Sequence, residues 1–207
     1  MHIAIAGNIG SGKTTLTGLL AQHYGWIPKF ETVAENPYLD PFYKDMPRWA
    51  FNLEVFFLKE RFKDVLDIAR AESNVVQDRS IFEGVYIFSA NNRDMGNLDA
   101  RDFETYMELF ELMTSLVDAP DLLIYLRSTV PHLVANIRKR GREYEQSMSI
   151  EYLENLNRRY DEFVFDKYPG PKLVIDVDGL DFLYNPKDFS DIVDRIDAKL
   201  FGLFEKV

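Results

Sequence analysis

Residues 3–14 read IAIAGNIGSGKT, a short apolar run that leads directly into a glycine-rich loop. The loop, from Gly7 to Thr14, matches the pattern G-x-x-x-x-G-K-T, in which a buried strand precedes the loop and a helix follows it. The apolar residues 3–6 and the amphipathic stretch 14–24 supply this context. The sequence therefore predicts a phosphate-binding loop after the first strand of an α/β fold, and a glycine-rich turn without function is the weaker alternative.

The residue types of this loop explain how it binds phosphate. Glycines let successive backbone N–H groups point at an anion, Lys13 adds a positive charge, and the Thr14 hydroxyl is a ligand for Mg²⁺. A helix that starts near Lys13 directs its positive end at the same anion. The residues that we expect to bind the phosphates of a nucleotide are Gly7, Asn8, Ile9, Gly10, Ser11, Gly12, Lys13, Thr14 and Thr15.

Short apolar runs and longer amphipathic stretches alternate along the chain. The runs expected to form strands are residues 3–6, 26–30, 74–77, 122–126 and 173–177. The stretches expected to form helices are residues 14–24, 49–70, 80–91, 101–117, 130–139, 150–168 and 187–200. Apolar strands separated by helices form parallel sheets that are covered on both faces. We therefore predict an α/β fold in one domain, residues 1–207, with a doubly wound five-stranded parallel sheet.

Composition excludes several classes of protein. The 207 residues carry a net charge of -10, which argues against a nucleic-acid binder because phosphate backbones are held mainly by Lys and Arg. The absence of cysteine excludes disulfides and Cys-ligated metals. The start of the chain does not resemble a signal peptide, and no apolar stretch approaches the roughly 18 residues of a membrane span. We expect a cytoplasmic protein that binds neither nucleic acid nor membrane.

Residues 101–117 are apolar around most of the helix that they are predicted to form. Only a narrow stripe through Glu104, Glu108 and Glu111 is polar. Such a helix either lies in the core or faces a second subunit. A homodimer is therefore one of two interpretations of this pattern.

Charged residues follow the second and third predicted strands. Glu31 follows the second strand, and Asp78-Arg79 follow the third. Both sets would meet at the carboxyl edge of a parallel sheet, where open α/β sheets bind ligands. There Asp78 is a candidate ligand for Mg²⁺, Arg79 can stabilise developing charge, and Glu31 can accept the proton of an attacking hydroxyl. A helix cap with a surface ion pair, and an exposed glutamate at a strand end, are the structural alternatives.

Residues 138–142 read RKRGR, four cations in an acidic chain. Such a run is usually a solvated surface. Here it follows a predicted helix and contains Gly141, so it is also suited to a mobile lid at about residues 138–147. Such a lid would bring Arg140 and Arg142 to a transferring phosphoryl group.

In combination, these motifs resemble the deoxynucleoside kinase family over nearly the whole chain, and most of all its bacterial deoxyadenosine and deoxyguanosine kinases. The residues that carry the resemblance are Gly7 to Thr14, Glu31, Asn36-Pro37-Tyr38-Leu39, Arg48-Trp49-Ala50-Phe51, Asp78-Arg79-Ser80 and Arg140-Gly141-Arg142. It implies transfer of the ATP γ-phosphoryl group to the 5'-hydroxyl of a purine deoxynucleoside in nucleoside salvage, with Mg²⁺ bound through Thr14 and Asp78.

The resemblance also implies roles for residues that bind the acceptor. Glu31 resembles the general base, and Arg79 resembles its partner near the 5' oxygen. Tyr43 and Glu145 resemble contacts to the sugar 3'-hydroxyl, and Phe88 resembles the aromatic residue that stacks on the base. Without the resemblance, core packing is the better interpretation of the two aromatic residues.

On the donor side, Arg140 and Phe182 resemble the pair that encloses adenine, with Asp181 beside them. Phe182, too, would otherwise be interpreted as a core residue. Charge on the transferring group would be stabilised by Lys13, Arg79, Arg140 and Arg142.

Two residues depart from the pattern of many relatives, at positions that read the base. Glu54 replaces a common Gln, and Gly84 replaces a common Asp. An ionised carboxylate only accepts hydrogen bonds, which suits the two adjacent donors of guanine. Arg61, seven residues after Glu54, would then be free to donate to guanine O6 and N7. We expect a preference for deoxyguanosine over deoxyadenosine, unless Glu54 is protonated or simply pairs with Arg61.

Three other classes share the phosphate-binding loop. A regulatory GTPase reads guanine through Asn-Lys-x-Asp, and here Asn185-Pro186-Lys187-Asp188 is interrupted by proline. A thymidylate-type monophosphate kinase needs cations for the acceptor's own phosphate, where this chain has Glu31 and Glu54. A non-catalytic nucleotide-binding regulatory protein is disfavoured by the predicted arginine lid.

Overall fold

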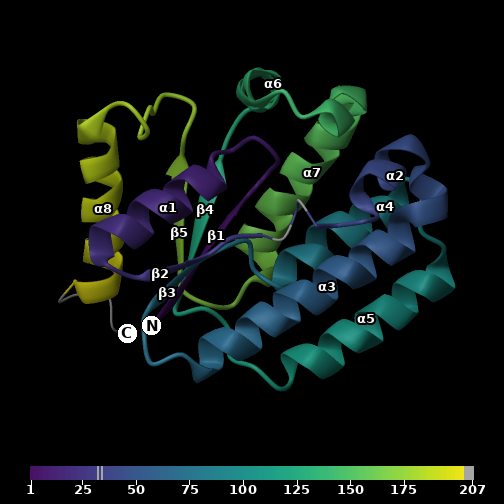
Figure 1. The fold of residues 1–207 in the computed structure, drawn as a ribbon, viewed down its shortest axis with the longest axis horizontal. Coiled ribbons are helices and arrows are strands. Elements are labelled where there is room, and N and C mark those ends of the chain that lie inside the picture. Colours follow the sequence, from purple (N-terminus) through teal and green to yellow (C-terminus); the bar gives the residue numbers. More distant parts are fainter. Residues whose placement is uncertain (32, 34, 203–207) are drawn as a thin grey trace.

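The computed structural model describes residues 1–31, 33 and 35–202 (Figure 1). Five parallel strands form its central sheet in the order β2-β3-β1-β4-β5. The strands are β1 (His2–Gly7), β2 (Ile27–Lys29), β3 (Val75–Asp78), β4 (Leu122–Arg127) and β5 (Lys172–Asp176). All five predicted strands and the doubly wound fold are confirmed.

The central strand shows why the sheet needs cover on both faces. Every residue of β1 is buried, and successive side chains of a strand point to opposite faces. Ile3 and Ile5 belong to the hydrophobic cluster on one face. Ala4 and Ala6 belong to the cluster on the other face, where they leave room for larger aromatic side chains.

Helices cover these two faces (Figure 1). The face of Ile3 and Ile5 packs against α1 (Lys13–Tyr24) and α8 (Pro186–Phe201) through buried residues of both helices. On the other face lie α7 (Ile150–Glu162) and the two π-helical segments η1 (Gly84–Ser89) and η3 (Phe163–Lys167). Outside η1 lie α3 (Met46–Arg70) and α5 (Ala100–Thr114), which share a third buried cluster.

Two predicted helices differ from the observed elements. The stretch 80–91 is a turn followed by η1 and α4 (Ala90–Asp94), and the stretch 150–168 ends in η3 rather than in α-helix. A π-helical segment has nearly the same side-chain spacing as an α-helix, so apolar periodicity does not separate them. Two short elements, α2 (Leu39–Lys44) and the 3₁₀ turn η2 (Glu143–Ser147), were not predicted because five or six residues give too little periodicity.

The elements near the carboxyl edge of the sheet form the surroundings of the site. The loop after β1 and the helix α6 (Val130–Arg140) lie at this edge, at the top of Figure 1.

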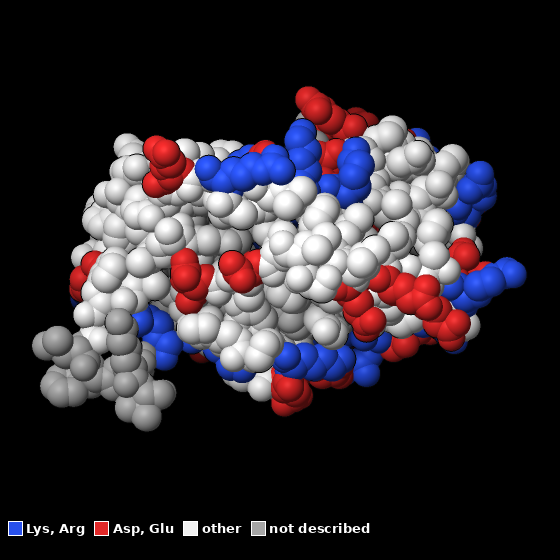
Figure 2. All heavy atoms as spheres, turned by 90° about the horizontal axis from the view of Figure 1, so that it is seen from below, with Lys and Arg blue, Asp and Glu red and all other residues white. Residues whose placement is uncertain are grey.

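No helix in the described part of the chain is long and apolar enough to cross a membrane. On the face in Figure 2, Lys and Arg side chains lie among Asp, Glu and uncharged residues.

The apolar helix α5 is partly a core helix. Tyr106 and Phe110 are buried, whereas Leu112 and Leu116 are 64% and 69% exposed. One side of the helix therefore packs in the core and another side presents leucines to the surface.

Candidate active site

The loop between β1 and α1 has the geometry of a phosphate cradle. Gly10 and Gly12 have φ of 86° and 95°, a conformation that side chains disfavour. A Cβ at Gly10 would lie 2.8 Å from the carbonyl oxygen of Leu133, and one at Gly12 would lie 2.8 Å from Cζ of Phe182. Glycine is therefore needed at both positions for the loop to take this path.

Asn8 fastens this loop to α7. Its Nδ2 donates to the carbonyl oxygen of Leu153 at 3.0 Å and to Oδ1 of Asn157 at 2.7 Å. Its Oδ1 accepts from the backbone N–H of Ile9 at 2.7 Å. The side chain thus shapes the loop and holds it in place, a role that the loop pattern alone did not indicate.

Lys13 lies in the cradle and is almost fully buried. Its Nζ donates to the carbonyl oxygen of Asn8 at 2.8 Å. Burial, and after it the nearby Arg79 guanidinium, lowers the pKa of Lys13 to about 7. An anion in the cradle would favour the charged form of Lys13 and be held by it in return.

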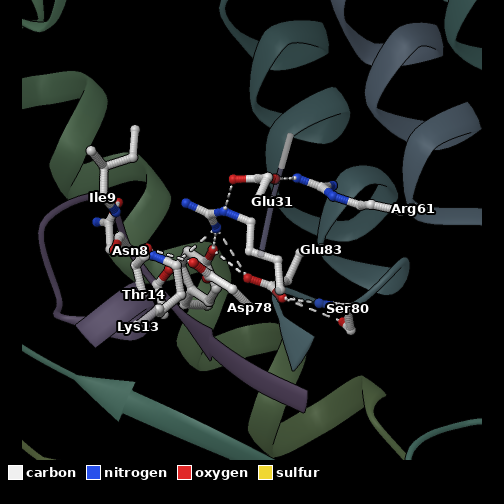
Figure 3. Close-up of polar contacts among 12 residues, drawn as sticks. Asn8, Ile9, Lys13, Thr14, Glu31, Arg61, Asp78, Ser80 and Glu83 are labelled. Carbon is white, nitrogen blue, oxygen red and sulfur yellow. Dashed lines mark hydrogen bonds and ion pairs between the residues drawn. The ribbon is translucent and has the colours of Figure 1, made fainter. Parts of the chain in front are cut away.

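Thr14 and Asp78 meet at the start of α1 and the end of β3, in the lower part of Figure 3. The Thr14 hydroxyl donates to Asp78 Oδ2 at 2.5 Å, while the buried Oδ1 has no hydrogen-bond partner. Burial raises the pKa of Asp78, and a cation would relieve that cost. Hydroxyl and carboxylate oxygens are ligands that Mg²⁺ accepts, with water and phosphate oxygens completing its shell, so the two residues fit this ion.

Glu31 is held by two arginines at the centre of the site (Figure 3). Its Oε1 accepts from Arg61 Nη2 at 2.5 Å, and its Oε2 accepts from Arg79 Nε at 2.8 Å. Burial alone would raise the pKa of Glu31, but Arg79 and Arg61 outweigh it and hold that pKa at about 2. The expected partnership with Arg79 is present. Arg61 is paired with Glu31 rather than with Glu54, an arrangement that the sequence did not indicate.

Arg79 is itself held in a buried network. Among the described residues it alone, apart from glycines, has positive φ, at 69°. Its Nη1 donates to Glu83 Oε1 at 3.1 Å and to the Tyr160 hydroxyl at 2.5 Å. Glu83 Oε2 in turn accepts from the backbone N–H of Ser80 at 2.7 Å. Arg79 is thus fixed by partners on one side and offers its Nε to Glu31 on the other.

A cavity of about 250 Å³ adjoins Glu31, and we call it the acceptor cavity. All seven residues expected to bind the acceptor line it: Glu31, Tyr43, Glu54, Arg61, Arg79, Phe88 and Glu145. The guanidinium carbon of Arg79 lies 4.9 Å from the centre of the Phe88 ring. The cavity therefore combines carboxyl groups, guanidinium groups and an aromatic face, as a nucleoside would require.

Glu54 forms part of the wall of the acceptor cavity, and it is 3% exposed. Its Oε1 accepts from Asn92 Nδ2 at 2.9 Å. Burial raises the pKa of Glu54 to about 7, and the Arg61 charge offsets only part of this rise. Arg61 Nε and Nη1 are buried without a hydrogen-bond partner among the described residues.

The predicted lid segment, residues 138–147, contains the end of α6, Gly141 and η2. Arg140 Nη2 lies 2.7 Å, and Arg142 Nη1 3.5 Å, from Oε1 of Glu145. The rings of Tyr144 and Tyr43 stack, with centres 5.6 Å apart. Glu145 was expected beside Tyr43 at a sugar hydroxyl, and in this structure it lines the acceptor cavity while bound to the two arginines.

A second cavity, of about 650 Å³, lies on the other side of the phosphate loop, and we call it the donor cavity. Residues 10–15 of the loop line it, together with the expected Arg140, Asp181 and Phe182. Lys139 and Tyr184 also line it, and their cation and ring centre are 5.7 Å apart. Arg140 and Arg142 border both cavities, so the cradle and the lid arginines lie between two ligand spaces.

Comparison with known proteins agrees with this geometry. The sequence profile of the family "Deoxynucleoside kinase" matches residues 3–201. The chain belongs to the deoxynucleoside kinase family. Like the other members, it is a kinase with small-molecule substrates, ATP as the phosphate donor and a deoxynucleoside as the acceptor.

The relatives of this deoxynucleoside kinase include enzymes with different printed substrates. The deoxyadenosine/deoxycytidine kinase of Bacillus subtilis is 39% identical over 94% of this chain and 90% of that protein. The deoxyguanosine kinase of Lactobacillus johnsonii is 37% identical over 98% and 95%. The structure of the M. mycoides deoxyadenosine kinase with bound dATP has a TM-score of 0.85 and 31% identity, and covers 95% of this chain and 100% of that one.

Several residues that shape the kinase site were missed by the sequence reasoning. Glu83 and Tyr160 hold Arg79, and Asn92 holds Glu54. The spacing of Glu83 four residues after Arg79, at the start of the helix predicted for residues 80–91, was the available signal. Tyr160 and Asn92 gave none, because their partners lie far away in the sequence.

Proposed function

We propose that this deoxynucleoside kinase transfers the ATP γ-phosphoryl group to the 5'-hydroxyl of a purine deoxynucleoside, deoxyguanosine and/or deoxyadenosine, in nucleoside salvage. The observation that carries this proposal is the placement of Glu31. It lies in the wall of the acceptor cavity, beside the phosphate cradle, and two arginines hold both of its oxygens. A carboxylate there suits an acceptor that must lose a proton, namely an alcohol.

Glu31 would act as the general base in this scheme. Its pKa of about 2 keeps it ionised at any physiological pH. A carboxylate of low basicity suffices because phosphoryl transfer has a loose transition state, in which the attacking hydroxyl becomes acidic late. Arg79 would remain beside the attacking oxygen and limit the charge that develops there.

Charge on the transferring group would be stabilised from both sides of the cradle. Lys13 is part of the loop and its Nζ lies beside the carbonyl oxygen of Asn8. Arg140 and Arg142 border both cavities. In this structure Glu145 binds both lid arginines. Binding of a sugar hydroxyl to Glu145 and Tyr43 would release these guanidinium groups toward the phosphates.

Mg²⁺ would be held through Thr14 and Asp78. The unpartnered Asp78 Oδ1 and the adjoining Thr14 hydroxyl support this assignment. When bound, the ion would neutralise charge on the β- and γ-phosphates. Phe182, stacked over Gly12 at the edge of the donor cavity, and Asp181 next to it would border the adenine together with Arg140.

For the base, we propose that Glu54 and Arg61 favour deoxyguanosine over deoxyadenosine. The two residues line one cavity without a hydrogen bond between them. Ionised Glu54 would accept from N1–H and the 2-amino group of guanine, and the unpartnered Arg61 Nη1 would donate to O6 or N7. A Cβ at position 84 would lie 3.1 Å from Arg61 Nη1, so an aspartate there would place its carboxylate beside this guanidinium group. Gly84 supplies no such partner for Arg61.

One assay tests the proposed function. ADP release is measured with ATP and Mg²⁺ in the presence of each deoxynucleoside, each ribonucleoside and each nucleoside monophosphate. We expect turnover with purine deoxynucleosides and little with monophosphates. Turnover only with a monophosphate would instead support the thymidylate-type alternative, and no turnover with any acceptor would support a regulatory protein.

We also propose that the kinase is a homodimer whose interface includes the exposed side of α5. Leu112 at the end of this helix and Leu116 in the turn that follows it support this placement because both are mostly exposed. Light scattering at micromolar concentration should give twice the mass of the chain. Leu112→Lys should yield monomers, whereas Phe201→Lys, an equally apolar and exposed position on α8, should leave the mass unchanged.

A further inference from the structure

Glu54 differs from Glu31, Glu83 and Glu145, which are all paired with arginines, in its partner. Its described hydrogen-bond donor is the neutral amide of Asn92 from α4, not a cation. Arg61, which lies on the same helix and lines the same cavity, turns its Nη2 to Glu31 instead. Glu54 is thus a buried acid at the base-reading end of the acceptor cavity without a salt bridge.

The groups around Glu54 do not fix its charge. Those that face it are Arg61 of α3, Glu31 after β2, Ser89 of η1, Asn92 of α4, Tyr106 of α5 and Tyr152 of α7. Burial, and to a smaller extent the Glu31 charge, favours the neutral form, whereas Arg61, Ser89 and Asn92 favour the ionised form. The balance raises the pKa of Glu54 to about 7, so both forms are populated near neutral pH.

We propose that Glu54 reads the acceptor base in two protonation states, so that the kinase favours deoxyguanosine when Glu54 is ionised and deoxyadenosine when it is neutral. This proposal rests on the proposed function, in which the base lies beside Glu54. It makes one side chain the determinant of purine selectivity and makes that selectivity depend on pH.

The hydrogen-bonding patterns of the two purines match the two forms. Ionised Glu54 offers two acceptor oxygens, which suit guanine N1–H and its 2-amino group. Neutral Glu54 offers one O–H donor and one acceptor, which suit adenine N1 and its 6-amino group. Guanine beside neutral Glu54 would place a donor against a donor, and adenine beside ionised Glu54 would place an acceptor against an acceptor. Each mismatch leaves a buried polar group without a hydrogen bond, which costs about 1–3 kcal/mol of binding free energy.

Asn92 acts as a positioning residue for this choice. Its amide donates to Oε1 of Glu54, so that oxygen must be an acceptor and, in the neutral acid, the proton lies on Oε2. Oε1 keeps a second lone pair for the base. Loss of the amide donor would disfavour the ionised form and raise the pKa of Glu54 further.

The test is the ratio of kcat/KM for deoxyguanosine to kcat/KM for deoxyadenosine, measured from about pH 6 to about pH 8.5. The titrations of ATP, Lys13 and other shared groups cancel in this ratio. If each purine requires one form of Glu54, the ratio follows the ratio of ionised to neutral acid. It should therefore rise about tenfold for each pH unit.

Three variants make the test specific. Glu54→Gln mimics the neutral acid and cannot ionise, so its ratio should favour deoxyadenosine and stay level with pH. Asn92→Leu should keep the slope and lower the ratio at every pH. Glu60→Gln, on the same helix but outside the acceptor cavity, should behave as the wild type.

Calorimetry supplies a readout that does not depend on turnover. At about pH 7, deoxyguanosine binding should release protons and deoxyadenosine binding should take them up. Titrations in buffers of different ionisation enthalpy measure the number of protons released or taken up on binding. Glu54→Gln should abolish both the release and the uptake. A ratio that stays level with pH, while both purines are phosphorylated, would overturn this inference alone. Failure to phosphorylate either purine at any pH would overturn the proposed function with it.

Discussion

Glu31 and Glu54 line the same cavity and are both buried, yet their acidities are shifted in opposite directions. Glu31 accepts hydrogen bonds from two arginines, and its pKa lies near 2. Glu54 accepts from one amide, and its pKa lies near 7. Both side chains are buried, so the difference in their pKa comes from the groups that bind each carboxylate and not from burial. Within one cavity the protein thus keeps one carboxylate ionised at physiological pH and leaves the other to titrate near neutral pH.

The largest expected effect comes from removing the charge of the first carboxylate. Glu31→Gln should lower kcat about 100- to 10,000-fold, because the amide cannot accept the hydroxyl proton. ATP affinity, measured by calorimetry, should change little, because Glu31 lies outside the donor cavity. Glu60→Gln is the control on an uninvolved glutamate. Full turnover by the Glu31 variant would show that the carboxylate is not the base.

The opposite pKa shifts also predict opposite effects of pH on stability. The folded pKa of Glu31 lies below its value in the unfolded chain, so its contribution is present at neutral pH and is lost as pH falls from about 4.5 toward 2. The folded pKa of Glu54 is raised, so its contribution is lost as pH rises through about 7. Each of these two contributions to the free energy of unfolding amounts to about 3 kcal/mol.

Urea unfolding at several pH values checks this contrast. The free energy of unfolding of Glu54→Gln, relative to that of the wild type, should rise by about 2–3 kcal/mol from pH 5 to pH 8. Glu31→Gln should be destabilised at pH 7 because two buried guanidinium groups lose a partner. Parallel pH curves for the wild type and the Glu54 variant would contradict the raised pKa.

A smaller effect should follow from loosening Arg79. Glu83→Gln removes the charge that holds Arg79 from the side opposite Glu31, so kcat should fall about 10- to 100-fold through misplacement. KM for both substrates should stay nearly constant, since Glu83 lines neither cavity. A rise in KM with unchanged kcat would place Glu83 in binding rather than in positioning.

The smallest effect concerns Arg61, which lies between the two carboxyl groups. Arg61→Met leaves Glu31 with Arg79 but removes a charge that favours ionised Glu54, whose pKa should rise. At neutral pH, the ratio of kcat/KM for deoxyguanosine to kcat/KM for deoxyadenosine should fall about tenfold for each unit of that rise, because less Glu54 is ionised. Lys59→Met is the matched control, because Lys59 lies on α3 and outside the acceptor cavity.

Local patterns in the sequence predicted most of the fold and the outline of the site. The loop at residues 7–14 and the acid-base pair Asp78-Arg79 depend on neighbours in the chain, and the strands before them are short and apolar. Glu31 was predicted because parallel strands end at one edge of the sheet.

The remaining contacts join residues that are distant in the sequence. Tyr160 lies 81 residues from Arg79, and Asn92 lies 38 residues from Glu54. No spacing rule connects such pairs, and only the packing of α7 and α4 decides which polar groups meet. The pairing of Arg61 with Glu31 was missed for the same reason: the sequence placed Arg61 beside Glu54 at the acceptor base and Glu31 at the 5' oxygen, without showing toward which carboxylate Arg61 turns.

The helix α7 touches both halves of the reacting assembly. At Leu153 and Asn157 it holds the Asn8 side chain of the phosphate loop, and at Tyr160 it holds Arg79 beside Glu31. The phosphate loop and the arginine beside Glu31 are therefore held by the same helix. A displacement of α7 would therefore move the phosphate loop and Arg79 together rather than apart.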